Sequence, residues 1–373
     1  MGIELIRRSE FIDFIRGIVI IDMMLVHYKE RLNIIAGVNL SKLIGYTDFA
    51  IEGFIFLAGF MVGYYYFKKF KEDKLKVVKR LLRRAANILK IHYIMILTIS
   101  LPLAFLFGDR ATGGESTSTY IFRSLVFLNQ VGLLHILPTF IPLFLISIPI
   151  LYALDRGCDF TVLLVSIGIF TFGNIDPYIL DIGDKTIFPV ILWQIYFVMG
   201  VLLGKKTCTT GFRVPGSRFT HLIIAASLLL VMSFVYFGHH LHPYIGHLKE
   251  SYDLKVSRFP LNFLGLFYRG SLLYLVFGIS IAAWQYIMRA QKTFSLIELL
   301  GRHSLLTFVI HIYFAKAVLV AEYLVGDLFP FPQIIITLNI CFTFVALQYI
   351  EVLQRQHDFA KRSYLSRIYR LVS

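Results

Sequence analysis

The chain has 373 residues, of which 57% are hydrophobic and only 16% are charged, and its formal net charge is +14. Soluble domains are about 45–50% apolar and about 25% charged, so this composition excludes a soluble enzyme. The mean hydropathy of +0.71 indicates a polytopic, all-α membrane protein. The basic residues lie between apolar runs, where Lys and Arg usually set membrane orientation, so we expect no nucleic-acid partner.

A membrane-spanning helix needs about 20 mostly apolar residues, and about ten runs approach this length. The expected spans are 11–28, 49–67, 88–107, 132–154, 159–174, 187–204, 219–238, 268–287, 304–325 and 332–353. The apolar segment 119–129 is too short to cross and predicts a re-entrant or interfacial helix.

The basic run from Lys68 to Arg84 fixes the expected orientation. Because Lys and Arg concentrate on the cytoplasmic side, both termini are predicted to be cytoplasmic. No linker separates a soluble domain, so we expect one membrane domain over 1–373. Its core is about 9–353, and 354–373 forms a basic cytoplasmic tail.

The first expected span holds ionisable residues, which are costly at membrane depth and therefore candidates for function. Arg16 and His27 are eleven positions apart, which returns them to one helix face about 16 Å apart in height. Asp13 lies one turn before Arg16 and is expected to pair with it. Asp48 and Glu52 begin the second span at the expected depth of His27, where a carboxylate would orient an imidazole. The alternative is that these charges only hold helices together.

A stripe of basic residues enters the third expected span from the cytoplasmic side. Its members are Lys76, Arg80, Arg83 and Lys90. Such a stripe could bind phosphates, for which Arg offers forked donors. The alternative is an orientation anchor at the lipid headgroups.

Two further features of the sequence involve histidines. His239, His240, His242 and His247 crowd one outer loop, but no Cys or carboxylate at ligand spacing accompanies them, so we expect no metal. His311 lies midway along the ninth span without a nearby carboxylate in sequence, and we expect a buried hydrogen-bonding group there.

Several strings resemble a known family of membrane acyltransferases. Ile12-Asp13-Phe14-Ile15-Arg16-Gly17, followed after Arg16 by ten residues and His27, resembles the opening of the acyltransferase-3 superfamily. Arg80-Leu81-Leu82-Arg83 resembles the Arg-x-x-Arg of that superfamily at the cytoplasmic mouth of the third span. Further strings resemble its OpgC family: Thr47-Asp48 through Glu52-Gly53-Phe54-Ile55-Phe56-Leu57-Ala58-Gly59, His135-Ile136-Leu137-Pro138, Trp193-Gln194 with Phe197 and Gly200, and Leu300-Gly301-Arg302-His303-Ser304-Leu305.

The resemblance implies an O-acyltransferase of the bacterial cytoplasmic (inner) membrane. It would move a succinyl or acetyl group from cytoplasmic acyl-CoA to a hydroxyl of a periplasmic glycan, with acyl-CoA as co-substrate and no bound cofactor. His27 would be the general base, oriented by Asp48 or Glu52, and Arg16 with Asp13 would stabilise the oxyanion. The basic stripe would hold the donor phosphates. The expected acceptor contacts are His135, Trp193, Gln194 and Arg269.

Two other classes stay open. In a transporter or flippase of an anionic molecule or lipid-linked glycan, Asp13, Arg16 and Glu52 would line a path, but such proteins usually show two similar halves with broken spans, and the sequence shows no such symmetry. A purely structural membrane subunit would leave His27 without an explanation.

Overall fold

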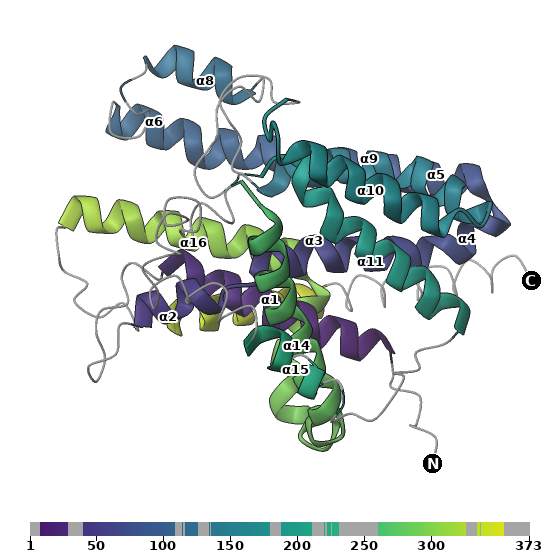
Figure 1. The fold of residues 1–373 in the computed structure, drawn as a ribbon. Coiled ribbons are helices and arrows are strands. Elements are labelled where there is room, and N and C mark those ends of the chain that lie inside the picture. Colours follow the sequence, from purple (N-terminus) through teal and green to yellow (C-terminus); the bar gives the residue numbers. More distant parts are fainter. Residues whose placement is uncertain are drawn as a thin grey trace, which may run out of the picture. The chain divides into compact units, whose positions relative to one another are not determined.

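Every element in the described part of the chain is a helix, which confirms the all-α prediction (Figure 1). The computed structural model describes residues 8–28, 40–108, 114, 116–125, 134, 136–179, 188–210, 220, 222–224, 226–230, 260–325, 334–335 and 337–353. Its elements are α1 (Arg8–Tyr28), α2 (Leu40–Thr47), α3 (Ala50–Met61), η2 (Val62–Tyr66), α4 (Phe67–Glu72), α5 (Lys74–Met95), η3 (Ile96–Ser100), α6 (Leu101–Phe107), α8 (Thr117–Leu125), α9 (Ile136–Asp155), α10 (Asp159–Gly173), α11 (Val190–Thr210), α14 (Phe263–Arg289), α15 (Gln291–Arg302), α16 (Ser304–Val325) and the helix Thr337–Leu353.

Five helices within the described residues are long and apolar enough to cross a membrane. They are Ile44–Glu72, Lys74–Phe107, Ile136–Asp155, Val190–Thr210 and Phe263–Trp284. A sixth crossing results if Phe294–Arg302 and Ser304–Val318, which meet at a 94° bend, count as one broken span. These helices identify a membrane protein. Ten spans and cytoplasmic termini stay predictions.

The other expected spans are not among these helices, and the reason is local to each of them. α1 is a 21-residue helix, but its apolar run includes Asp13, Arg16 and Asp22. α10 has 15 residues, and the last expected span is the short apolar helix Thr337–Leu353. The run 219–238 lies partly outside the described residues.

The short apolar segment 119–129 overlaps the nine-residue helix α8, Thr117–Leu125. At 1.5 Å per residue such a helix is far too short to cross the hydrocarbon core, as the sequence predicts.

The chain folds into two compact units. Unit 1 is Met1–Arg8 with Tyr46–Gln285, and unit 2 is Ser9–Gly45 with Tyr286–Ser373. Unit 1 contains α3 to α11 and most of α14, whereas unit 2 contains most of α1, α15, α16 and the helix Thr337–Leu353. The single membrane domain expected from the sequence stays a prediction.

Two pairs of glycines hold α3 and its continuation η2 against α11 in unit 1. Gly59 and Gly63 lie four residues apart, as do Gly200 and Gly204, and a Cβ at any of them would collide with the backbone of the facing helix. Small residues at this spacing let helix backbones approach closely inside membranes. Figure 1 shows α3 and α11 running side by side.

α5 packs against α9, and the buried face of α5 is mostly apolar. The Asp73 carboxylate accepts from the backbone N–H of Lys76 at 2.9 Å, so Asp73 caps the helix at its start. The buried residues recur every three or four positions and are Val77, Leu81, Ala85, Ile88, His92 and Met95. This periodicity fixes the rotation of α5 about its axis.

Glycines also bring α1 against α15 in unit 2. A Cβ on Gly17 would collide with the Ile297 carbonyl, and a Cβ on Gly301 would collide with the backbone of Asp13. The rings of Phe14 and Phe294 pack edge to face at 5.8 Å. The stretch of α1 that carries Asp13 and Arg16 is therefore held closely against α15.

Candidate functional site

His27 contacts a second histidine in unit 2. Its Nδ1 lies 2.7 Å from Nε2 of His311, which belongs to α16 and is separated by 284 residues in sequence. The two rings are nearly parallel, at 5°, with centroids 4.9 Å apart. Two parallel rings whose nitrogens are 2.7 Å apart and whose centroids are 4.9 Å apart must lie edge to edge. The hydrogen bond between them therefore runs nearly in the plane that both rings share.

The contact continues from His311 to a buried amide. Asn339 Nδ2 lies 2.8 Å from His311 Nδ1 and donates to the Tyr28 hydroxyl at 2.8 Å. The Thr343 hydroxyl donates to Asn339 Oδ1 at 3.1 Å. His311, Asn339 and Thr343 are all 0% exposed, whereas His27 is half-buried. We call His27, His311 and Asn339 the His–His–Asn chain.

Sequence reasoning found half of this arrangement. It predicts His27 as the reactive group and His311 as a buried hydrogen-bonding group, and the structure confirms that His311 is buried and bonded. It missed that His311 bonds to His27 itself, and it did not single out Asn339. The sequence does show a histidine and an asparagine, His311 and Asn339, within apolar runs. A single sequence, however, contains no pattern that pairs residues separated by hundreds of positions.

Arg16 and Asp13 form the expected ion pair on α1. Arg16 donates to an Asp13 oxygen at 3.4 Å, and their side chains are 16% and 21% exposed. The spacing of three residues makes this contact local, which is why the sequence could predict it. Both side chains keep some exposure, so a bound anion could still reach the guanidinium.

A second charged group of unit 2 lies at the bend between α15 and α16. Glu351 accepts from Arg302 at 2.8 Å, and its Oε1 lies 3.1 Å from Nε2 of His303. His303 is the residue at which the two helices turn. These contacts tie the bend to the helix Thr337–Leu353, and sequence reasoning did not single out Glu351.

Asp48 and Glu52 lie in unit 1, where both are buried. Asp48 Oδ1 accepts from the backbone N–H of Ala50 at 3.1 Å, and Arg269 donates to the carbonyls of Tyr46, at 3.1 Å, and Asp48. The entry to α3 is therefore fixed by Arg269. The pairing of either carboxylate with His27 stays a prediction, because His27 belongs to the other unit.

Trp193 and Gln194 lie in the core of unit 1. Trp193 is 0% exposed and packs edge to face on Phe188 at 5.4 Å. The Gln194 amide accepts from the Ser166 hydroxyl at 2.7 Å and donates to the Ser166 carbonyl at 2.8 Å. These contacts join α10 to α11, so the structure gives both residues a packing function. Contact of either with the acceptor stays a prediction.

The basic stripe is confirmed as one face of α5. Lys76, Arg83 and Lys90 are exposed and Arg80 is partly exposed, away from the buried face of the helix. The neighbouring Arg84 differs, because its guanidinium lies over the Phe144 ring at 5.2 Å. The stripe is therefore available for an anion, whether phosphate or lipid headgroup.

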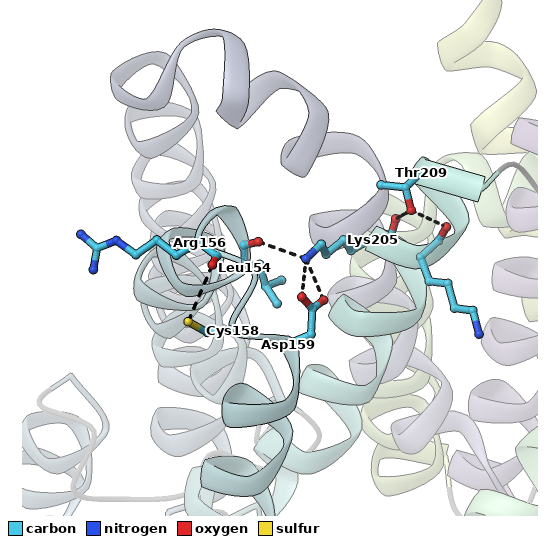
Figure 2. Close-up of polar contacts among 7 residues, drawn as sticks. Leu154, Arg156, Cys158, Asp159, Lys205 and Thr209 are labelled. Carbon is cyan, nitrogen blue, oxygen red and sulfur yellow. Dashed lines mark hydrogen bonds and ion pairs between the residues drawn. The ribbon is translucent and has the colours of Figure 1, made fainter.

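Lysine–aspartate pairs join the helix ends near this stripe in unit 1. Figure 2 shows Lys205 of α11 between the Leu154 carbonyl, at 3.0 Å, and the Asp159 carboxylate, at 2.6 Å. Lys74 at the start of α5 binds Asp155 at 2.6 Å. These pairs fasten the turn between α9 and α10 to α5 and α11.

Two predictions fall on residues outside the described part of the chain. They are the acceptor contact of His135 and the histidine cluster that contains His239, His240, His242 and His247. Within the described residues no group of three or more His, Cys, Asp or Glu side chains is arranged to hold a metal.

Comparison with known proteins identifies the family of the chain. No curated protein and no solved structure matches the chain. A family model described as OpgC protein matches residues 7–355, which include α1, the basic stripe and all of the His–His–Asn chain. The wider acyltransferase-3 relationship stays a prediction. Because the match covers nearly the whole sequence, the chain belongs to the OpgC family.

Proposed function

We propose that the protein is a membrane-embedded O-acyltransferase that modifies a glycan outside the cytoplasmic membrane. The donor is a cytoplasmic acyl-CoA carrying a succinyl or acetyl group, and the acceptor is a hydroxyl of a periplasmic glucan. Membership of the OpgC family over residues 7–355 is the observation that carries this proposal. The half-buried imidazole of His27 supports it by supplying a suitable base.

The reaction is an attack of a sugar hydroxyl on a thioester. As the oxygen bonds to the carbonyl carbon, the hydroxyl proton passes to His27 Nε2. The tetrahedral intermediate then collapses, the carbon–sulfur bond breaks, and the coenzyme A thiolate takes the proton back from His27. Protons and charge balance, and His27 ends neutral.

Arg16 is proposed to stabilise the oxyanion that forms on the thioester carbonyl, or a carboxylate of a succinyl donor. Its loose ion pair with Asp13 holds the guanidinium on the face of α1 that also carries His27. The phosphates of coenzyme A bind to the exposed stripe of α5, where Arg80 and Arg83 offer forked donors.

The test is a two-sided transfer assay. The purified protein is reconstituted in vesicles with labelled acyl-CoA inside and glucan outside. We expect label on the external glucan in an ester linkage, and labelling that is about 10²–10⁴-fold slower with the His27→Ala variant. Glucan that crosses the membrane without gaining label would instead establish a transporter.

A further inference from the structure

Lys316 is a charged residue that the proposed function does not use. It belongs to α16, twelve residues after Ser304 and nine before Val325, and its side chain is half-buried. At 1.5 Å per residue these intervals are about 18 Å and about 14 Å. If α16 crosses the membrane as the sequence predicts, the methylene stem of a lysine is too short to carry its ammonium to the headgroups on either side.

The ammonium of Lys316 lacks a counter-charge within the described part of the chain. No hydrogen bond, ion pair or ring contact joins Lys316 to another residue there. Lys74 and Lys205 differ, because each is paired with an aspartate at 2.6 Å. An ionisable group at membrane depth is costly and usually serves a substrate, an ion or a partner. A cation in this position therefore indicates an anionic ligand.

α1 and α16 run in the same direction within unit 2. Near its start, α1 lies against the end of α15, where a Cβ on Gly301 would collide with the backbone of Asp13. Near its end, His27 of α1 lies 2.7 Å from His311 of α16. The advance along α1 from Asp13 to His27 is therefore parallel to the advance along the chain from Gly301 to His311.

Lys316 lies beyond the contact between the two histidines, on the side away from the start of α1. It follows His311 by five residues, which is an advance of about 7.5 Å along the helix axis and a turn of about 140° around it. Ala315 and Val318, its neighbours on α16, pack against a cluster that contains Tyr28, the last residue of α1. Lys316 thus stands somewhat more than one helical turn past the proposed base.

A donor that enters from the cytoplasm would reach these residues in a fixed order. The expected orientation places the start of α1 on the cytoplasmic side, and the proposed reaction places the thioester carbonyl beside His27. The free end of the acyl group is the part farthest from coenzyme A, so it extends past His27 toward the level of Lys316. A succinyl group ends in a carboxylate, whereas an acetyl group ends in a methyl group.

We propose that Lys316 determines the acyl specificity by binding the carboxylate at the free end of a short dicarboxylic acyl group such as succinyl. This inference rests on the proposed function and decides between its two donors. A lysine ammonium and a carboxylate form a charge-assisted hydrogen bond, which is strong where water is scarce. The guanidinium of Arg16 is then left for the oxyanion rather than for the donor carboxylate.

The transfer test compares three acyl donors that differ at the free end. Succinyl-CoA carries the carboxylate, butyryl-CoA has an acyl chain of the same length that ends in a methyl group, and acetyl-CoA is shorter. Lys316→Met removes the charge and keeps an unbranched side chain, whereas Lys316→Arg keeps the charge. The control is Lys206→Met, which removes one charge from an exposed position of α11.

We expect the wild type to prefer succinyl-CoA over butyryl-CoA in kcat/KM, and Lys316→Met to reduce this preference by roughly 10–10²-fold, as for the loss of one charge-assisted hydrogen bond. Transfer from acetyl-CoA and butyryl-CoA should change little in Lys316→Met. Lys316→Arg and Lys206→Met should keep the preference. An unchanged preference in Lys316→Met would overturn the inference and leave the proposed function intact. An equal loss with all three donors would also overturn it, because the cation would then serve the fold.

A binding measurement keeps the test independent of transfer and, in the wild type, independent of any variant. Calorimetry with the protein in nanodiscs measures the affinities for succinyl-CoA and butyryl-CoA. We expect the wild type to bind succinyl-CoA at least tenfold more tightly, and Lys316→Met to bind the two equally. Equal affinities in the wild type would overturn the inference, whether or not transfer is observed. A wild type that binds succinyl-CoA preferentially but transfers no acyl group to glucan would overturn the proposed function instead.

Discussion

Several buried polar side chains of unit 1 differ in their hydrogen-bond partners from a group of side chains in unit 2. In unit 1, Ser147, Ser271 and Arg269 all donate to backbone carbonyls. In unit 2, His27, His311 and Asn339 bond to one another through their side chains. A bond to a carbonyl fixes the direction of its hydrogen, whereas bonds among imidazole, amide and hydroxyl groups can reverse theirs. The bonds to carbonyls in unit 1 hold helices in place, whereas the side-chain bonds of unit 2 include His27, the proposed base.

This difference predicts which variants change chemistry and which change stability. Substitution of His27 in unit 2 should lower the rate of acyl transfer and spare the fold. Substitutions at the close contacts of unit 1 should lower the melting temperature first.

The largest effect on the rate is expected for His27→Ala. Loss of the general base should lower kcat by about 10²–10⁴-fold while affinity for the acyl donor stays near normal. Acyl transfer in membranes with equal amounts of each protein measures the rate, and calorimetry with acyl-CoA measures the affinity. A His27→Ala variant with a lower melting temperature but a wild-type transfer rate would contradict the difference proposed between the two units.

The largest effect on stability is expected for Gly200→Leu. A side chain here meets the Phe56 backbone of α3, which cannot move aside as a flexible side chain would. Overpacking of this kind costs about 1–3 kcal/mol or more, so the purified yield and the melting temperature should fall. Gly168→Ala is the control, because a Cβ on Gly168 meets nothing within 4 Å. Equal melting temperatures for the two variants would contradict the glycine contact.

A smaller effect is expected for the double variant Arg80→Ala/Arg83→Ala. If this stripe holds the donor phosphates, the loss of charge-assisted hydrogen bonds of about 1.5–3 kcal/mol each should weaken binding of coenzyme A at least tenfold. Arg84→Ala removes a charge from the same helix but from the side that packs on Phe144, and should bind normally. If the double variant binds coenzyme A as tightly as the wild type does, the stripe is instead an orientation anchor at the lipid headgroups.

The smallest effect is expected for Lys205→Met. The change removes the contacts with Asp159 and Leu154, but the Asp159 side chain is 45% exposed and solvent screens the pair. The variant should lose about 1 kcal/mol of stability or less and keep its transfer rate. A large loss of activity would show that this junction does more than stabilise unit 1.

Local patterns carried most of what the sequence could predict. The Asp13–Arg16 pair follows from a spacing of three, and the single basic face of α5 follows from helical periodicity. The expected span 304–325 begins after the 94° bend at His303, and the sequence analysis did not predict the helix before the bend, which carries the charged residues Glu298 and Arg302. The contact between His27 and His311 was missed because it joins distant segments through packing of α1 against α16, which no spacing in one sequence encodes.

The central claim is that His27 receives the proton of the acceptor hydroxyl. An experimental density map of the protein with a non-hydrolysable acyl-CoA analogue and a glucan fragment tests it most directly. The account predicts the analogue's phosphates at Arg80 and Arg83, and an acceptor hydroxyl about 2.6–3.2 Å from His27 Nε2 beside the acyl carbonyl carbon. An acyl carbon bound away from His27, next to another base, would contradict it.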